Sequence, residues 1–371
     1  MLLFSNGFEA GLLRISTYET ATQLLTICVI FCTGAIANPR HGHFNRHGNI
    51  LITDQFNNRV IEIDPAGNIV WHFGNGPNDV SANSIIGTND AERVGGLTLM
   101  AGTGAPGGTE PLCPPPNGCI DNRVMLMNHG HHIVWQYGTF GVTGSGFNQL
   151  NVPVQNTYLS EENGDDHVLI TDQGNGRIIE VRRSDKAIVW QYDGLNNPNS
   201  AELLENGNIL ISDENNNQAL EVTHTMPSTI VHTYTQAGGV PFSGVAFASR
   251  LPNDHTLITD SANSRIVETD ETGADFWHFF TNARPGSNTM PLPTRAVRLE
   301  NGDTLISDQF NHQVIKVDSS GNIVAPEYGN INQAGFGTQS VSQGMNGPYS
   351  AYVIGDYTGI TPPFDDEDGD D

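Results

Sequence analysis

Short apolar runs alternate with polar turns along most of this chain of 371 residues. Residues 50–53 form one apolar run, residues 60–63 a second and residues 69–71 a third, which ends on Trp71. Runs of this length, bounded by Asn, Asp and Gly, are typical of β-strands joined by tight turns. The composition agrees, because 41 glycines and a charged fraction of only 15% suit many short strands.

The same pattern returns along the chain, anchored on an aspartate that ends the first apolar run of each copy. An asparagine follows three residues later, then Arg or Gln, then a second apolar run. Clean copies are 41 to 48 residues apart, which is the period of a four-stranded propeller blade. The repeated residues are Asp54, Asp172, Asp213, Asp260 and Asp308, then Asn57, Asn175, Asn216, Asn263 and Asn311, and the third-run tryptophans Trp71, Trp135, Trp190 and Trp277.

A sixth copy is interrupted by an insertion. Residues 121–138 match residues 57–74 without a gap, and residues 97–101 supply the preceding strand, with Gly102 at the aspartate position. Residues 103–120 replace the short turn of the other copies. The chain is therefore predicted to be all-β, a six-bladed β-propeller of four-stranded antiparallel blades over residues 38–357.

Two segments compete to complete the first blade. Residues 43–46 place Asn45 where other copies have Leu, whereas residues 350–354 keep the apolar pattern. We favour closure by the C-terminal strand, because a closed ring has no exposed strand edges. Residues 358–371 then form an acidic tail that we expect to be disordered.

The first 37 residues indicate export. Residues 24–31 are strongly apolar, and residues 35–37 read Ala-Ile-Ala, which fits a signal-peptide cleavage site. Two glutamates offset the single arginine ahead of the apolar run, so an uncleaved N-terminal anchor and a cytoplasmic protein are the alternatives. A secreted, periplasmic or cell-surface location would suit a disulfide between Cys113 and Cys119, which bracket a short turn-rich loop.

The formal net charge is −25, from 16 basic and 41 acidic residues. Such a surface repels phosphate groups, so we expect no nucleic-acid partner. Contact with a membrane is expected only through an uncleaved N-terminal segment. The repeated Asp and Asn side chains have a structural explanation, because both form Asx turns. The alternative is calcium, the one cofactor suggested, because it prefers hard oxygen ligands.

Departures from the repeat are better candidates for function. Residues 103–120 should overhang the face that carries the turns after the repeated aspartates, and loops on a rigid scaffold often bind ligands. We weigh a ligand or partner site there against a loop without a role. His129, His131 and His132 lie in a turn on the opposite face. A solvated turn is favoured over a transition-metal site, because strand alternation points His131 and His132 apart.

Three arginines on the predicted inner strands suggest a second ligand site. Arg250 and Arg298 occupy equivalent positions in adjacent blades, and Arg295 lies close by. In the central channel, their guanidinium groups would offer bidentate partners to carboxylate, sulfate or phosphate. The alternative, which we favour, is internal pairing with acids such as Glu202.

Residues 54–62, Asp-x-x-Asn-x-Arg-Val-Ile-Glu, resemble the NHL-repeat family of six-bladed propellers. Residues 64–71, Asp-x-x-Gly-x-x-x-Trp, look like the tryptophan-docking motif of quinoprotein (PQQ-type) propellers, and the combination resembles bacterial PQQ-like or arylsulfotransferase-like proteins. The resemblance implies blade packing by tryptophan rather than a quinone cofactor, because quinoprotein dehydrogenases have eight blades. The His-x-x-Glu-x-x-His pattern of streptogramin lyases, which are also propellers, does not occur.

Two main classes of function follow. The first is an exported scaffold that binds a protein, a glycan or a small anionic ligand without chemistry of its own, because no catalytic constellation accompanies the repeats. The second is a hydrolase, lyase or sulfotransferase-like enzyme that uses an arginine-lined channel. Assembly with further copies of the chain or with a cell-surface partner is a third. The fold alone does not decide among them.

Overall fold

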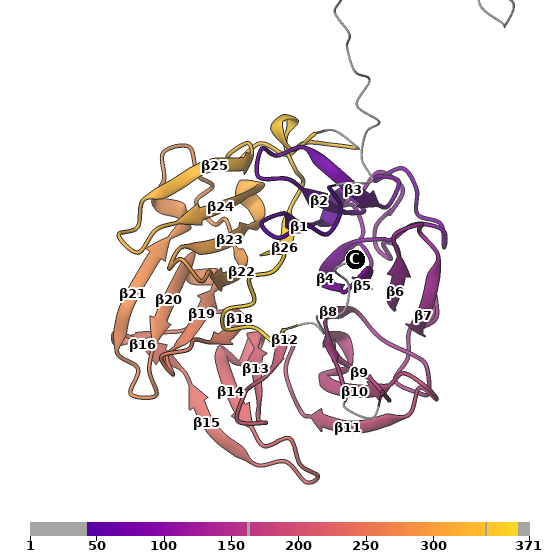
Figure 1. Ribbon diagram of the computed structural model, residues 1–371, viewed down its shortest axis with the longest axis horizontal. Helices are drawn as coiled ribbons and strands as arrows, with labels where there is room; N and C mark the ends of the chain where they lie inside the picture. The colour runs from indigo at the N-terminus through magenta and orange to yellow at the C-terminus, as the bar shows by residue number, and fades with distance from the viewer. Residues whose placement is uncertain (1–42, 162–163, 338–339, 363–371) are drawn as a thin grey trace, which may run out of the picture. The chain divides into compact units, whose positions relative to one another are not determined.

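A computed structural model describes residues 43–161, 164–337 and 340–362. They form six four-stranded antiparallel sheets that follow one another around a ring (Figure 1). The prediction of a six-bladed β-propeller is thus confirmed. Within the described residues, no helix has the length and apolar character needed to span a membrane. The predicted signal segment, residues 1–37, lies outside the described residues.

Each blade runs from an inner strand beside the ring axis to an outer strand at the rim. The first three blades, each from inside to outside, are β26 (Pro348–Val353), β1 (Ile50–Asp54), β2 (Arg59–Ile63) and β3 (Ile69–Phe73); β4 (Thr88–Val94), β5 (Leu97–Gly102), β6 (Arg123–Asn128) and β7 (Ile133–Gly138); and β8 (Pro153–Leu159), β9 (His167–Asp172), β10 (Arg177–Arg182) and β11 (Ile188–Asp193).

The remaining three blades have the same order. They are β12 (Pro198–Leu203), β13 (Ile209–Asp213), β14 (Gln218–Val222) and β15 (Ile230–Tyr234); β18 (Val245–Arg250), β19 (Thr256–Asp260), β20 (Arg265–Thr269) and β21 (Asp275–Phe280); and β22 (Pro293–Arg298), β23 (Thr304–Asp308), β24 (Gln313–Val317) and β25 (Ile323–Gly329). A small hairpin, β16 (Gln236–Ala237) and β17 (Val240–Pro241), lies between blades 4 and 5 along the chain.

The C-terminal strand closes the ring, as predicted. β26 pairs antiparallel with β1, with Ile50 opposite Val353 and Ile52 opposite Ala351. Residues 43–46 form no strand and lie beside blade 1. Their Asn45 instead donates its backbone N–H to Glu62 of β2 at 2.7 Å. Closure by β26 pairs the inner edge of β1, which would otherwise present unsatisfied backbone groups.

One end of the ring, here called the upper face, carries the turns that follow the repeated aspartates. These turns are single 3₁₀ helices, η1 (Gln55–Asn57), η2 (Gln173–Asn175), η3 (Glu214–Asn216), η4 (Ser261–Asn263) and η6 (Gln309–Asn311). Two further ones, η5 (Thr281–Ala283) and η7 (Val341–Gln343), lie in connecting segments. The opposite end, called the lower face, carries turns such as residues 129–132 and 205–207.

The repeated aspartate ties each turn to the linker that enters its blade. In blade 1, the buried carboxylate of Asp54 accepts hydrogen bonds from Asn57 (2.9 Å), Arg59 (2.7 Å) and the backbone N–H of Asn346 (2.7 Å). The aspartates of blades 3, 4 and 5 accept an equivalent linker N–H at 2.7–2.8 Å. The repeated aspartate therefore forms the same internal crosslink in blades 1, 3, 4 and 5.

Blade 2 keeps this crosslink although it lacks the aspartate. Asp121, at the end of the insertion, accepts the linker N–H of Ile86 at 2.9 Å and pairs with Arg123. A Cβ atom on Gly102 would lie only 2.4 Å from Oδ2 of Asp121. The carboxylate thus reaches the usual place from the residues just before β6 instead of from the end of β5. This arrangement requires glycine at position 102.

The tryptophans of the outer strands fasten neighbouring blades together. Three donate their indole N–H to a backbone carbonyl of the next blade at 3.0–3.3 Å: Trp71 to His129, Trp135 to Arg183 and Trp190 to Thr225. The fourth, Trp277, lies 5.0 Å from the guanidinium of Arg298 in the next blade. Both kinds of contact join one blade to the next.

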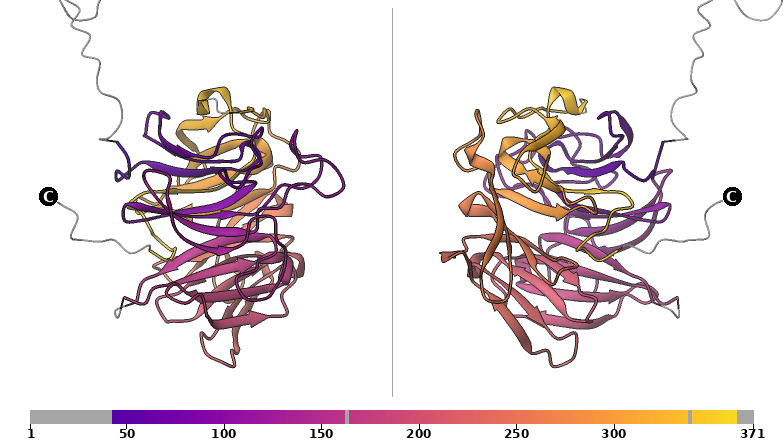
Figure 2. Two further views of the ribbon diagram at one scale, coloured as in Figure 1. Left: turned by 90° about the vertical axis from the view of Figure 1, so that its right-hand side faces the viewer. Right: turned by 60° about the vertical axis from the view of Figure 1, so that its left-hand side comes forward.

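The chain beyond β26 continues onto the lower face. In the left view of Figure 2, this yellow segment lies at one face of the ring. Thr361 donates its backbone N–H (2.9 Å) and its hydroxyl (2.8 Å) to Glu202 of blade 4. Residues 358–362, which the sequence places in the acidic tail, therefore lie against the propeller, because Thr361 satisfies a buried carboxylate. Residues 363–371 lie outside the described residues.

Candidate ligand-binding site

The central channel is filled by side chains rather than open. Its two cavities measure only about 20 and 10 Å³. Arg295 lies between them, with one guanidinium nitrogen 2.6 Å from Asp90 and another 3.6 Å from Glu202. Glu92 also lines the channel, and burial raises its pKa well above the ordinary value. One cation among three acids is a poor receptor for an anion.

Arg250 and Arg298 do not line these channel cavities, contrary to the expectation from sequence. Each side chain points sideways to the preceding blade, where Arg250 pairs with Glu221 at 2.7 Å and Arg298 pairs with Glu268 at 3.0 Å. The reason is strand alternation, since Arg295 and Arg298 are three residues apart on β22 and face opposite sides. All three predicted arginines are thus paired with acids, and anion binding by them stays a prediction.

The histidine turn also contacts a neighbouring blade. The ring of His131 packs edge-on against Trp71 and Phe73, with ring centroids 5.7 and 5.6 Å apart. The ring of His129 packs against Phe44, with centroids 4.4 Å apart. Burial lowers the pKa of His131. Among the described residues, His129, His131 and His132 form no convergent set of metal-ligand atoms. They help to seat blade 2 on blade 1, and metal binding by them stays a prediction.

The upper face holds a pocket of about 450 Å³ above the channel, and the insertion forms one of its walls. Its floor comes from residues that directly follow the repeated aspartates and from the first residues of inner strands. The lining residues are Gln55, Asn89, Thr103, Gly104, Ala105, Pro106, Asn117, Cys119, Ile120, Asn122, Thr143, Asn151, Val152, Gln173, Asn197, Glu214 and Tyr349. A volume of this size suits a small ligand.

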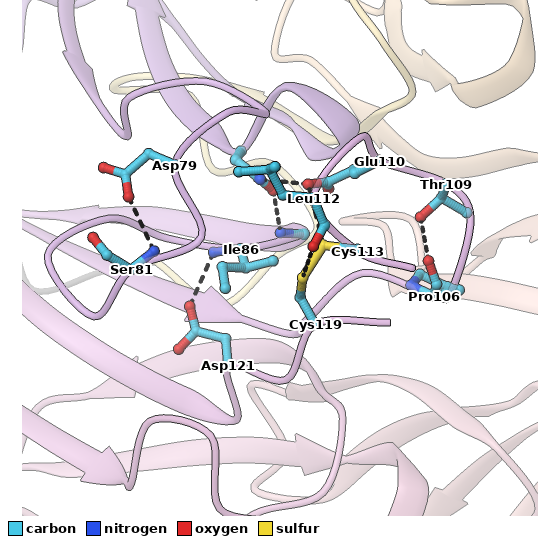
Figure 3. The surroundings of a disulfide bond; sticks show 12 residues. Asp79, Ser81, Ile86, Pro106, Thr109, Glu110, Leu112, Cys113, Cys119 and Asp121 are labelled. Atoms are coloured by element: carbon cyan, nitrogen blue, oxygen red, sulfur yellow. Dashed lines mark hydrogen bonds between the residues drawn. A yellow bond between two sulfur atoms is a disulfide. The ribbon is translucent and has the colours of Figure 1, made fainter. Parts of the chain in front are cut away.

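The insertion is held in place at several points. A disulfide joins Cys113 and Cys119, as predicted, and a β-bridge pairs Ala105 with Cys119 (Figure 3). At the far side, Asn58 of blade 1 donates its amide to Glu110 at 2.5 Å. Burial raises the pKa of Glu110 to about 7. These ties make the wall a braced structure rather than a free loop.

Amide side chains link the floor of the pocket into a network. Gln309 donates to Gln55 at 2.7 Å, and Gln55 donates to Asn89 at 2.8 Å. On the far side, Asn197 and Asn199 of blade 4 donate to the Glu214 carboxylate at 2.8 and 3.0 Å. Such bonds fix the orientation of the polar groups before any ligand arrives.

Among the described residues, Glu214 is the only carboxylate that lines the pocket, and no Lys, Arg or His lines it. Burial raises its pKa, and the hydrogen bonds from Asn199 and Asn197 only partly oppose this effect. The nearby hydroxyl of Tyr349 donates to Asn199 at 2.9 Å, and burial raises the pKa of Tyr349. The pocket thus offers neutral hydrogen-bonding groups around a single acid.

Reducing the disulfide should loosen the pocket wall. Replacing Cys113 and Cys119 together by serine removes a crosslink worth about 2 kcal/mol for so short a loop. We expect backbone amides of residues 103–120 to exchange with deuterium at least about tenfold faster, while the blades exchange as before. Hydrogen-exchange mass spectrometry measures both, and unchanged exchange in residues 103–120 would show that the other ties suffice.

The fold and this site define a six-bladed β-propeller with a polar pocket on one face. No protein-family model matches the chain. No curated protein matches it either.

Solved structures resemble the chain in fold. A protein of unknown function from Bacteroides caccae shares 13% identity over 82% of this chain and 98% of its own, with a TM-score of 0.51. Virginiamycin B lyase from Staphylococcus aureus shares 15% identity over 68% of this chain and 72% of its own, with a TM-score of 0.44. BamB from Moraxella catarrhalis shares 14% identity over 78% of this chain and 75% of its own, with a TM-score of 0.38. The order of the sheets itself establishes the propeller fold, and these similarities leave the activity open.

Proposed function

We propose that the protein is an exported propeller that binds a small, neutral or cationic polar ligand, of the sugar or amino-sugar class, in the upper-face pocket and performs no chemistry on it. The observation that carries the proposal is the pocket lining, in which fixed amides surround Glu214 and no cationic side chain is present. Asn, Gln and Glu side chains pair well with hydroxyl and ammonium groups. An anion would lie near this acid without a cationic side chain to offset the repulsion.

The position of the pocket supports the same proposal. Its floor is rigid, because blades 1 to 4 all contribute to it, and its wall is a disulfide-braced insertion. Binding groups on a rigid scaffold lose little entropy when a ligand arrives. A disulfide also suits an oxidising compartment, which supports export. An enzyme that uses the channel has less support, because Arg295 is paired and the channel cavities are small.

Titration of a panel of neutral sugars, amino sugars and polyols by isothermal calorimetry tests this proposal. At least one compound should bind, and Glu214→Gln should weaken that binding about tenfold or more, because a hydrogen bond to a charged group is lost. Glu205→Gln is the matched control, since Glu205 is exposed on a lower-face turn. Equal affinity in the two variants, or turnover of the bound compound, would contradict the proposal.

A further inference from the structure

A glutamate in the third strand of three blades receives the same pair of partners. One partner is an Asn or His five residues before the repeated aspartate of its own blade, and the other is an arginine of the next blade. Asn49 and Arg93 reach Glu62, Asn208 and Arg250 reach Glu221, and His255 and Arg298 reach Glu268. The arginine neutralises a carboxylate buried between two blades.

The boundary between blades 3 and 4 departs from this scheme. The glutamate is Glu180, only 4% exposed, but Leu203 occupies the place of the arginine on β12. Two histidines take over instead. His167 of the same blade contacts one carboxylate oxygen through Nδ1, and His224 of the next blade contacts the other through Nε2. The buried acid therefore lacks the permanent cation that its three counterparts have.

A second acid completes the cluster. Oε1 of Glu161 lies 3.8 Å from Nδ1 of His167, on the chain just before β9. The ligand atoms of Glu161, His167 and Glu180 all lie within 4.8 Å of one another. Burial acts to raise the pKa of Glu180, but contacts with His224 and then His167 outweigh it and leave the pKa lowered.

We propose that Glu161, His167 and Glu180 bind a divalent transition-metal ion such as Zn²⁺, with water completing the coordination. One imidazole nitrogen and two carboxylate oxygens form a donor set that Zn²⁺ accepts. His224 holds the second oxygen of Glu180 and thereby orients this ligand from outside the coordination sphere. Side-chain exposures of 43% for Glu161 and 15% for His167 leave the ion a path from solvent.

The ion would replace the missing arginine as the positive charge at this blade boundary. It would link residues of blade 3 directly and blade 4 through His224. A substitution that restores the arginine scheme should therefore remove the site without damaging the fold. Leu203→Arg does so on β12, and His167→Asn installs the residue that blades 1 and 4 have at this position, Asn49 and Asn208.

Zinc binding to the full chain, freed of metal with a chelator, is measured by calorimetry with ZnCl₂ at pH 7.5. We expect one ion per chain with micromolar or tighter affinity, weakened at least tenfold in both His167→Asn and Leu203→Arg. The matched control is His255→Asn, because His255 contacts Glu268 beside Arg298, which occupies the cation position. This variant should bind zinc as wild type does.

The histidine turn of blade 2 provides the competing location. His131→Asn should leave zinc affinity unchanged. Loss of binding in His131→Asn, with binding retained in His167→Asn, would assign the ion to that turn and overturn the proposal. Absence of zinc binding to the wild-type chain would overturn it as well. Thermal unfolding of every variant verifies that the propeller is folded.

Discussion

Replacing Asp54 by alanine is expected to lower the free energy of unfolding by about 3–5 kcal/mol, the largest effect of any single change considered for this chain. The substitution removes the carboxylate that forms an ion pair with Arg59, a side chain only 1% exposed. It also removes the acceptor for Asn57 and for the backbone N–H of Asn346, which leads into the ring-closing strand. Burying a charge without its partner costs far more than the pair contributes.

Denaturant unfolding of the two proteins measures this difference. Asp270→Ala is the matched control, because Asp270 is likewise a turn-forming aspartate that accepts local hydrogen bonds, but it is only partly buried. The control should unfold much like the wild type. If Asp54→Ala lost less than about 1 kcal/mol, the repeated aspartate would not be the crosslink described above.

Replacing Asp308 by asparagine should raise the free energy of unfolding at alkaline pH, the opposite of the effect expected for Asp54→Ala. In blade 6 the arginine position is occupied by Gln313, whose amide donates to Glu327 and to the Gly329 carbonyl. The linker N–H binds Asn311 instead, and among the described residues no hydrogen bond reaches Oδ1 of Asp308, while Arg284 lies 3.7 Å from Oδ2. Burial raises the pKa of Asp308 to about 7.

The pH dependence follows from that raised pKa. A carboxyl whose folded pKa exceeds its unfolded value of 3.8 contributes stability below pH 3.8 and loses it as the pH rises through about 7. The loss amounts to at most about 4 kcal/mol. Asparagine cannot ionise, so Asp308→Asn should be more stable than wild type at pH 8 and similar near pH 4. Chemical denaturation at both pH values tests this, and parallel pH profiles would contradict it.

The fold could be predicted from the sequence because the Asp and Asn of the blade crosslink recur in five of the six copies. The Asp, Asn and Arg that form it are the residues that reveal the period, and Trp71, Trp135 and Trp190 mark the blade boundaries. Blade 2 could be identified in the sequence because it differs from the pattern mainly in its carboxylate, which comes from Asp121 instead of position 102. Ring closure followed from the apolar pattern of residues 350–354.

The prediction that all three arginines face the channel was wrong, and the sequence contained the information needed to correct it. Residues 295 and 298 differ by three, so on a strand they cannot both face the channel. Arg250 aligns with Arg298 and points the same way. What could not be seen is that Thr361, beyond the last strand, returns to cap Glu202. No local pattern predicts a contact 159 residues away along the chain.

The pocket was predicted in part. The insertion at residues 103–120 was expected to overhang the upper face, and it lines the pocket there. The residues of the pocket floor were not predicted. Several of them directly follow a repeated Asp, and the repeat pattern assigns no role to that position. That residue is Gln55, Gln173 or Glu214 in three of the blades that line the pocket, and it varies where its neighbour is constant. Variation beside an invariant turn was the usable signal.

The most direct test of the account is a crystal structure of the protein with the tightest-binding sugar or amino sugar of the panel. The account predicts ligand density on the upper face, between the insertion and Glu214, with hydrogen bonds to the floor amides such as Gln55. Density at the lower mouth of the channel beside Thr361, or along the outer strands, with the upper-face pocket empty, would contradict it.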